Sequence, residues 1–89
     1  MENYIVNQRM KETVLGKGEG TVLYDPETEN THILDDVAVD IIDLFRKEMS
    51  LDDVITELTK IYDAPKETIE TDVQEFIEMA IKNQIIIPA

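Results

Sequence analysis

The chain has 89 residues, of which 43% are hydrophobic and 31% are charged, and its formal net charge is −12 at pH 7. This length fits a single domain with one modest core, and the hydrophobic content argues against wholesale disorder. The acidic excess lies entirely in residues 25–89, because residues 1–24 carry three acids and three bases. Such a surface repels phosphate groups, which argues against nucleic acid and anionic lipid as partners.

The sequence contains no cysteine, which excludes disulfides, thiolate nucleophiles and thiolate metal sites. Residues 1–10 lack the apolar core of a signal peptide, and no run reaches the ~18 apolar residues that a membrane helix needs. We therefore predict a cytoplasmic protein with no membrane partner.

The first part of the chain is predicted to form strands. Residues 1–9 show little periodicity and fit either an arm or an irregular first strand; we assign them to an N-terminal arm before a single domain over residues 10–87. Three short β-prone runs follow, at residues 10–15, 21–24 and 31–34. The glycine-rich residues 16–20 are interpreted as a hairpin turn rather than a phosphate loop, because a strand follows the glycines where a phosphate loop needs a helix. An antiparallel meander is the simplest pairing.

Three helices are predicted after the strands. Asp35 and Ser50 are suited to cap the first two, and Pro65 suits the first turn of the third. Their apolar stripes are predicted at Val37, Ile41, Leu44 and Phe45; at Leu51, Val54, Ile55, Leu58, Ile61 and Tyr62; and at Ile69, Val73, Phe76, Ile77, Ala80 and Ile81. Residues 85–87 form a final strand or a tail packed on the core. The sequence thus predicts an α+β fold of winged helix-turn-helix type, with a three-stranded antiparallel β-meander followed by three α-helices.

Side chains suited to catalysis or metal binding are sparse. His32 is the only histidine, and we interpret it as a surface or strand-pairing residue, since a general base or metal ligand needs partners around it. Residues 25–36 imitate the spacing of a calcium-binding loop, but Asn30 replaces its glycine and Asp36 its bidentate glutamate. We therefore predict no catalytic residue, no metal and no cofactor, and favour a binding module over an enzyme.

The third predicted strand, residues 31–34, is an edge of the meander with one row of unpaired backbone N–H and C=O groups. Such an edge either accepts a guest strand from a peptide or is covered by the third helix or the C-terminal tail. The residues alone leave these two alternatives equally weighted. An uncovered edge also fits pairing with a second copy, so the chain is predicted to be a monomer or an edge-paired dimer.

The order and spacing of several segments resemble the PqqD family, whose members recognise leader segments of ribosomally made, post-translationally modified peptides. The segments are residues 22–27, a strand ending at residue 34, and residues 51–58, 72–77 and 84–86. The resemblance covers roughly residues 10–87. The chain departs from the family pattern at Asp35, Ala64 and Gln84, where the family commonly has asparagine, a capping residue and glycine. Aspartate caps a helix about as well as asparagine, so the role of Asp35 survives.

The resemblance implies a fold without catalysis of its own, to which a precursor-peptide leader adds as a strand beside the third helix. It also implies a modifying enzyme as partner, either a radical-SAM enzyme, as in pyrroloquinoline quinone synthesis, or a peptidase with cyclase, as in lasso peptides. Carried over by position, the peptide-binding residues are Glu29, Asn30, Thr31, His32, Ile33, Leu34, Asp72, Glu75, Phe76 and Met79. Leu34 and Phe76 equally fit the core, and Asp72 fits a local cap or ion pair. Met79 fits either a peptide pocket or core filling.

The charge of the chain bears on its partners. A surface of net charge −12 favours encounter with a leader or an enzyme that carries basic residues. The alternative function is a winged-helix DNA-binding regulator, which needs a basic recognition helix. The two candidate recognition helices, over residues 51–82, carry many more acidic than basic residues, so we rank this alternative second.

Overall fold

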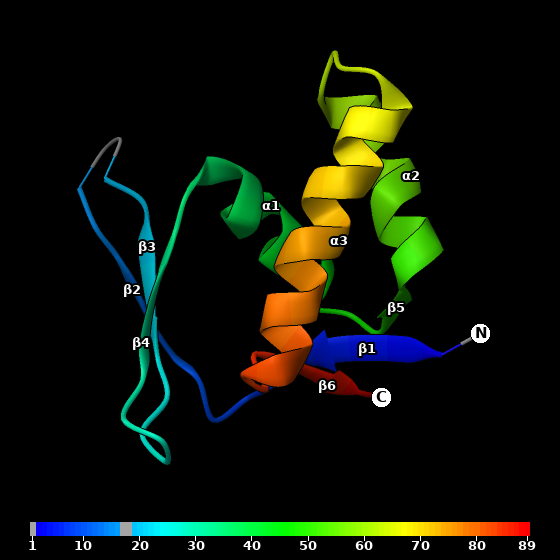
Figure 1. Ribbon diagram of the computed structural model, residues 1–89. Helices are drawn as coiled ribbons and strands as arrows, with labels where there is room; N and C mark the ends of the chain where they lie inside the picture. The colour runs from blue at the N-terminus through cyan, green and yellow to red at the C-terminus, as the bar shows by residue number, and fades with distance from the viewer. Residues whose placement is uncertain (1, 17–18) are drawn as a thin grey trace.

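The computed structural model describes residues 2–16 and 19–89, which form three helices and six short strands (Figure 1). The elements are β1 (Asn3–Val6), β2 (Lys11–Val14), β3 (Thr21–Tyr24), β4 (Thr31–Leu34), α1 (Asp36–Leu44), β5 (Met49–Ser50), α2 (Leu51–Ile61), α3 (Lys66–Lys82) and β6 (Ile86–Pro88). The predicted α+β class is confirmed, with two antiparallel sheets in place of one. Of the predicted hairpin turn over residues 16–20, Lys17 and Gly18 lie outside the described residues.

The first sheet is the predicted meander, in the order β2-β3-β4. Its register pairs Leu23 with His32 and Thr21 with Leu34. Gly20 has a φ of +88°, and a Cβ atom there would lie 2.4 Å from the carbonyl oxygen of Leu34. A glycine is therefore required where the chain enters β3 beside the end of β4.

The second sheet has the order β5-β1-β6, with β1 as its central strand. Residues 1–9 were predicted to be an N-terminal arm, and this is corrected for β1, which pairs with residues 49–50 on one side and 86–88 on the other. All four residues of β1 are half-buried, so the segment lacks the alternation by which a strand is recognised. Its partners lie far away in the sequence, which also hides the pairing from local patterns.

The helix starts are confirmed. The Asp35 carboxylate accepts a hydrogen bond from the backbone N–H of Ala38 at 2.8 Å, and the Ser50 hydroxyl accepts one from Asp53 at 3.2 Å. The helix before β6 follows Pro65, which makes no side-chain cap. The predicted stripes are wrong at three positions, since Val37, Ile61 and Ile81 are exposed. Each lies within two residues of a helix end, where the neighbouring elements no longer cover it.

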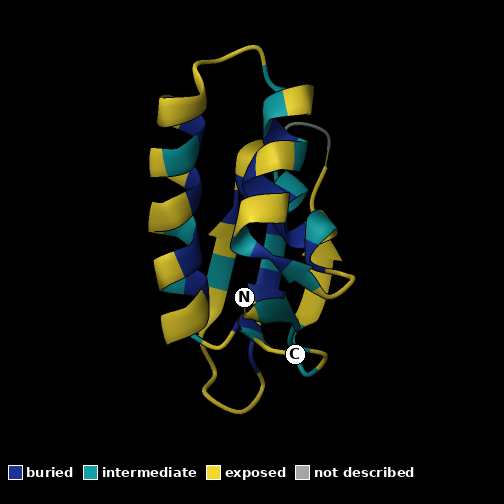
Figure 2. Ribbon diagram, turned by 90° about the vertical axis from the view of Figure 1, so that its right-hand side faces the viewer, coloured by how far each residue is buried: buried dark blue, intermediate teal, exposed yellow. Residues whose placement is uncertain are grey.

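The core lies between the helices and the inner faces of both sheets, and Figure 2 shows the buried stripes of the helices turned inward. The buried apolar residues are Leu23, Leu34, Ala38, Ile41, Ile42, Phe45, Val54, Ile55, Leu58, Ile69, Val73, Ile77, Ala80, Ile85 and Ile86. They come from β3, β4, β6 and all three helices, so this one core fixes the position of β4 relative to α1 and α3. Among the described residues, no helix is long and apolar enough to span a membrane.

Candidate functional site

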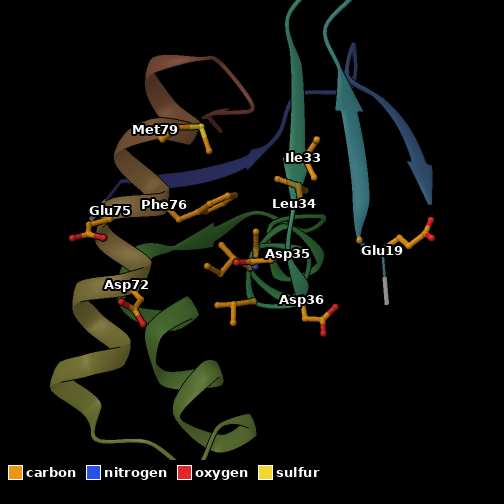
Figure 3. A pocket seen from close by; sticks show the side chains of 13 residues that line it. Glu19, Ile33, Leu34, Asp35, Asp36, Asp72, Glu75, Phe76 and Met79 are labelled. Atoms are coloured by element: carbon orange, nitrogen blue, oxygen red, sulfur yellow. The ribbon is translucent and has the colours of Figure 1, made fainter. Parts of the chain in front are cut away.

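A groove of about 820 Å³ separates β4 from α3, and the first turns of α1 contribute to its lining (Figure 3). It is lined by Glu19, Gly20, Ile33, Leu34, Asp35, Asp36, Val37, Ala38, Ile41, Asp72, Glu75, Phe76 and Met79. The groove thus has one wall from the end of the meander and another from one flank of α3. Both walls include residues that belong to the core or pack against it, such as Leu34 and Phe76.

The strand that borders the groove has a free edge. Within residues 2–16 and 19–89, β4 pairs with β3 and with no other strand. The C-terminal residues, which the sequence left as a possible cover for this edge, pair with β1 instead. Among the described residues, therefore, neither the C-terminal tail nor another strand covers the free edge of β4. The groove lies between this edge and α3.

The pairing pattern shows which backbone groups are available at this edge. The N–H of Asp25 donates to the carbonyl of Asn30 at 2.8 Å, just beyond the ends of β3 and β4. In an antiparallel ladder, hydrogen-bonded and non-hydrogen-bonded pairs alternate, so His32 and Leu34 point their backbone groups toward β3. Thr31 and Ile33 point theirs away from β3, toward the groove side.

The groove has an apolar floor. Leu34 and Ile41 are buried core residues that also border it, whereas Phe76 and Met79 are half-buried, pack against the core and expose their remaining surface to the groove. Phe76 points across the groove toward Leu34 in Figure 3. Leu34 and Phe76 therefore border both the core and the groove; their place at the core is confirmed, and their role in peptide binding stays a prediction.

Carboxylates surround this floor. Glu19, Asp36, Asp72 and Glu75 line the groove, and none of the four makes an ion pair or a side-chain hydrogen bond among the described residues. The local ion pair considered for Asp72 is therefore absent among the described residues. Asp35 also lines the groove, but its carboxylate is engaged in capping α1.

The predicted peptide-binding residues divide into two groups, and their role in binding stays a prediction. Ile33, Leu34, Asp72, Glu75, Phe76 and Met79 line the groove, whereas Glu29, Asn30, Thr31 and His32 do not. Glu29 has a φ of +63° and belongs with Asn30 to the turn that closes the β3–β4 hairpin. His32 faces the core side, opposite Leu23, and its Nε2 is buried without a hydrogen-bond partner among the described residues.

Several lining residues were not predicted from the sequence: Glu19, Gly20, Asp35, Asp36, Val37, Ala38 and Ile41. Asp35 and the apolar Val37 and Ile41 were noticed only for their roles in the helix. The signal that points to them is their position, directly after an edge strand, where a helix start lies beside any ligand of that edge.

The acidic turn between β3 and β4 is fixed by an ion pair. Asp25 is fully buried, and Arg9 donates to both of its carboxylate oxygens, at 3.1 and 2.9 Å. The bond from Arg9 is the main cause that lowers the pKa of Asp25 to about 2. Asp25 thus pairs with an arginine rather than serving a calcium loop, and among the described residues no cluster of three potential metal ligands occurs.

The same arginine connects the β3–β4 turn to the residues that follow α3. Its guanidinium also donates to Glu27 at 3.1 Å and to the side-chain oxygen of Gln84 at 2.7 Å, just after α3. Gln84 has a φ of +57°, a conformation that favours glycine.

The fold and the groove together define a small α+β domain of winged-helix type with an open sheet edge beside a helix. The signature of the family described as Coenzyme PQQ synthesis protein D (PqqD) matches residues 20–86, well over half of the chain. The chain therefore belongs to the PqqD family, which confirms the resemblance seen in the sequence. No curated protein matches it.

Three solved structures are similar to the chain. One is TbiB1 in complex with the TbiA(beta) leader peptide, with a TM-score of 0.77 and 16% identity over 92% of this chain and 93% of that one. Another is a lasso peptide synthetase B1 with its leader peptide, with a TM-score of 0.78 and 21% identity over 96% and 98%. The third is the PqqD part of Methylobacterium extorquens PqqCD, described as a stand-alone recognition element for ribosomally synthesised and post-translationally modified peptides. Its TM-score is 0.74, with 21% identity over 96% of this chain and 88% of that one. At these identities the likeness shows a shared fold.

Proposed function

We propose that this chain binds the leader segment of a ribosomally made precursor peptide, which adds as a strand to β4 and lies in the groove beside α3. The open edge of β4 next to a groove with an apolar floor is the observation that carries this proposal. Membership of the PqqD family supports it, as does the presence of leader peptides in two structures of the same fold.

Strand addition accounts for both affinity and selectivity. The free backbone groups of Thr31 and Ile33 supply hydrogen bonds to any extended guest, whatever its sequence. Alternate side chains of the guest then face the groove, where Phe76 and Met79 offer apolar surface that is still partly exposed. Burial of that surface stabilises the complex, and the shape of the floor selects which guest side chains fit.

In this proposal the chain holds the peptide and presents it to a separate modifying enzyme, either a radical-SAM enzyme or a leader peptidase with cyclase. The proposal assigns the chain no catalytic step. Binding takes place in the cytoplasm, where ribosomes make the precursor, and a sequence without cysteine suits that reducing compartment. DNA binding is not proposed, because acidic side chains of α3 line the groove.

The proposal is tested by an NMR titration of the labelled protein with synthetic leader segments of candidate precursor peptides. We expect shift changes confined to residues 29–34 and to the flank of α3 that carries Asp72, Phe76 and Met79. Changes that are absent or scattered over α2 would contradict the proposal. Changes on β4 that follow protein concentration instead of peptide concentration would indicate pairing between two copies.

A proline substitution makes the titration specific for strand addition. Ile33→Pro removes a backbone N–H that the fold does not use, so the domain should stay folded while the guest loses a hydrogen bond. Ile33→Ala is the matched control, since it removes the same 77%-exposed side chain and keeps the N–H. Weaker binding for the proline variant alone supports pairing at this edge.

A further inference from the structure

The charges of the groove are distributed on both sides of its apolar floor. Figure 3 shows Asp72 and Glu75 on the α3 side, and Asp36 and Glu19 on the side where β4 ends. Phe76 and Leu34 lie between them. A guest strand between β4 and α3 therefore has Asp72 on the α3 side and Asp36 near the end of β4, with Glu75 and Glu19 farther out at the rim.

No positively charged side chain of the described residues lines the groove. The ion pairs among the described residues lie outside the groove, such as Arg46 with Glu12, Lys60 with Glu57 and Lys66 with Glu70. Carboxylates of like charge around one groove repel each other when it is empty. A bound positive charge would relieve this repulsion and gain direct ion pairs.

The start of α1 does not reverse this preference. A helix N-terminus attracts anions through its free N–H groups and its dipole. Here the Asp35 carboxylate already accepts a hydrogen bond from Ala38, and Asp36 adds a second negative charge in the first turn. The positive end of the helix is therefore matched by the protein's own carboxylates, and an acidic guest would meet a net negative site.

We infer that the guest of this groove carries lysine or arginine side chains next to an apolar anchor, so that the anchor contacts Phe76 and Met79 while the basic groups pair with Asp72, Glu75 and Asp36. This inference rests on the proposed function and specifies the class of peptide. It differs from a general attraction by the net charge, because it assigns the selectivity to carboxylates at the groove.

The probe is a displayed library of random peptides, selected on the immobilised wild-type protein. The selected peptides should combine apolar residues at alternate positions with lysine or arginine beside them. One selected peptide is then synthesised with its basic residues and with glutamate in their place. We expect the basic form to bind about tenfold more tightly at low salt, as two or three partly exposed ion pairs would give.

Two double variants separate the groove from the overall charge. Asp72→Lys with Glu75→Lys reverses the charge on the α3 wall and should reverse the preference, so that the glutamate form binds better. Glu67→Lys with Glu78→Lys is the matched control, because it changes exposed residues of the same helix by the same charge, and neither residue lines the groove. All four positions are exposed, and circular dichroism checks that both variants fold.

Each result supports or overturns the inference. It is overturned if the selected peptides lack basic residues, or if the control variant changes the preference as much as the groove variant. If the selected peptides show no charge preference but Ile33→Pro weakens their binding, this inference is overturned while the proposed function stands. Peptides that bind equally well to Ile33→Pro, or a selection that enriches none, would overturn both.

Discussion

The edge strands of the two sheets differ in length and in proline content. The β5-β1-β6 sheet ends in a two-residue strand on one side and in a strand with Pro88 on the other. Short strands and proline are devices that keep a sheet edge from pairing with another chain. Both edge strands of the β2-β3-β4 sheet instead have four residues and no proline, and one of them, β4, lies beside a groove with an apolar floor. The β5-β1-β6 sheet closes the fold, and the β2-β3-β4 sheet leaves the edge of β4 unpaired among the described residues.

Proline substitution in each sheet tests this difference between the edges most directly, and the largest loss of stability is expected in β1. The ladder places the N–H of Ile5 opposite Ile87, between the observed bonds from Asn7 to Ile85 and from Ala89 to Asn3. Ile5→Pro therefore removes a bond in a central strand and leaves the Ile87 carbonyl without its donor, which should lower the free energy of unfolding by about 3 kcal/mol, the upper end for an unsatisfied buried group.

Ile33→Pro is the counterpart in the open edge and should change the free energy of unfolding far less. Chemical denaturation of both variants measures the difference. Equal losses for the two substitutions would mean that β4 uses the Ile33 N–H within the fold, and the edge would not be free.

The next prediction concerns Arg9, whose guanidinium links the β3–β4 turn to Gln84, between α3 and β6. Arg9→Ala leaves the buried Asp25 carboxylate without its partner, so the midpoint of thermal unfolding should fall by several degrees, less than for Ile5→Pro. Because the pKa of Asp25 is about 2 when folded and 3.8 in its unperturbed state, its stabilisation is present above pH 4 and is lost as pH falls toward 2.

Thermal unfolding of the wild type and of Asp25→Asn between pH 2 and pH 6 checks this dependence. The asparagine variant should lose less stability over the acidic range than the wild type does. Parallel curves for the two proteins would show that other carboxylates cause the acid sensitivity.

These contrasts also explain what the sequence could predict. The meander and the helix starts follow from local signals, namely the turn residues after Tyr24 and the caps Asp35 and Ser50. The second sheet was missed because β1 pairs with residues more than forty positions away. The pair of Arg9 with Asp25 was hidden for the same reason, since nothing local marks which acid an arginine will reach.

The groove was predicted in part for a related reason. A periodic stripe shows which residues of a helix are apolar, but it does not show which part of the stripe remains uncovered. Val37 and Ile41 were therefore assigned to the core alone, although the structure leaves the first turns of α1 open to the groove. The α3 residues of the site came from the family resemblance, whereas the periodicity of α3 assigned Phe76 to the apolar stripe that faces the core.

A smaller loss of stability is expected from substitutions in the groove, which should weaken peptide binding more than they destabilise the fold. Phe76→Ala removes half-buried apolar surface from the floor, and affinity for a bound leader peptide should fall about tenfold. The free energy of unfolding should change less than in Phe45→Ala, because Phe45 is fully buried. Isothermal titration with denaturation curves of both variants gives the comparison. A Phe76 variant that loses stability as Phe45→Ala does, with unchanged affinity, would make Phe76 a core residue only.

The smallest effect is predicted for Tyr62, whose side-chain hydrogen bond connects the end of α2 to α1. Its hydroxyl donates to the Asp40 carboxylate, and this bond is the main cause that raises the pKa of Tyr62 to about 12. The folded state therefore holds the proton more tightly than the unfolded chain, whose tyrosine titrates near pH 10. The stabilisation is complete below pH 10 and is lost as pH rises toward 12. Tyr62→Phe should cost about 1 kcal/mol at neutral pH and remove this alkaline phase, with leader affinity unchanged. Denaturation at pH 7 and pH 11 measures it, and a loss of leader binding would show that the α1–α2 contact also sets the groove.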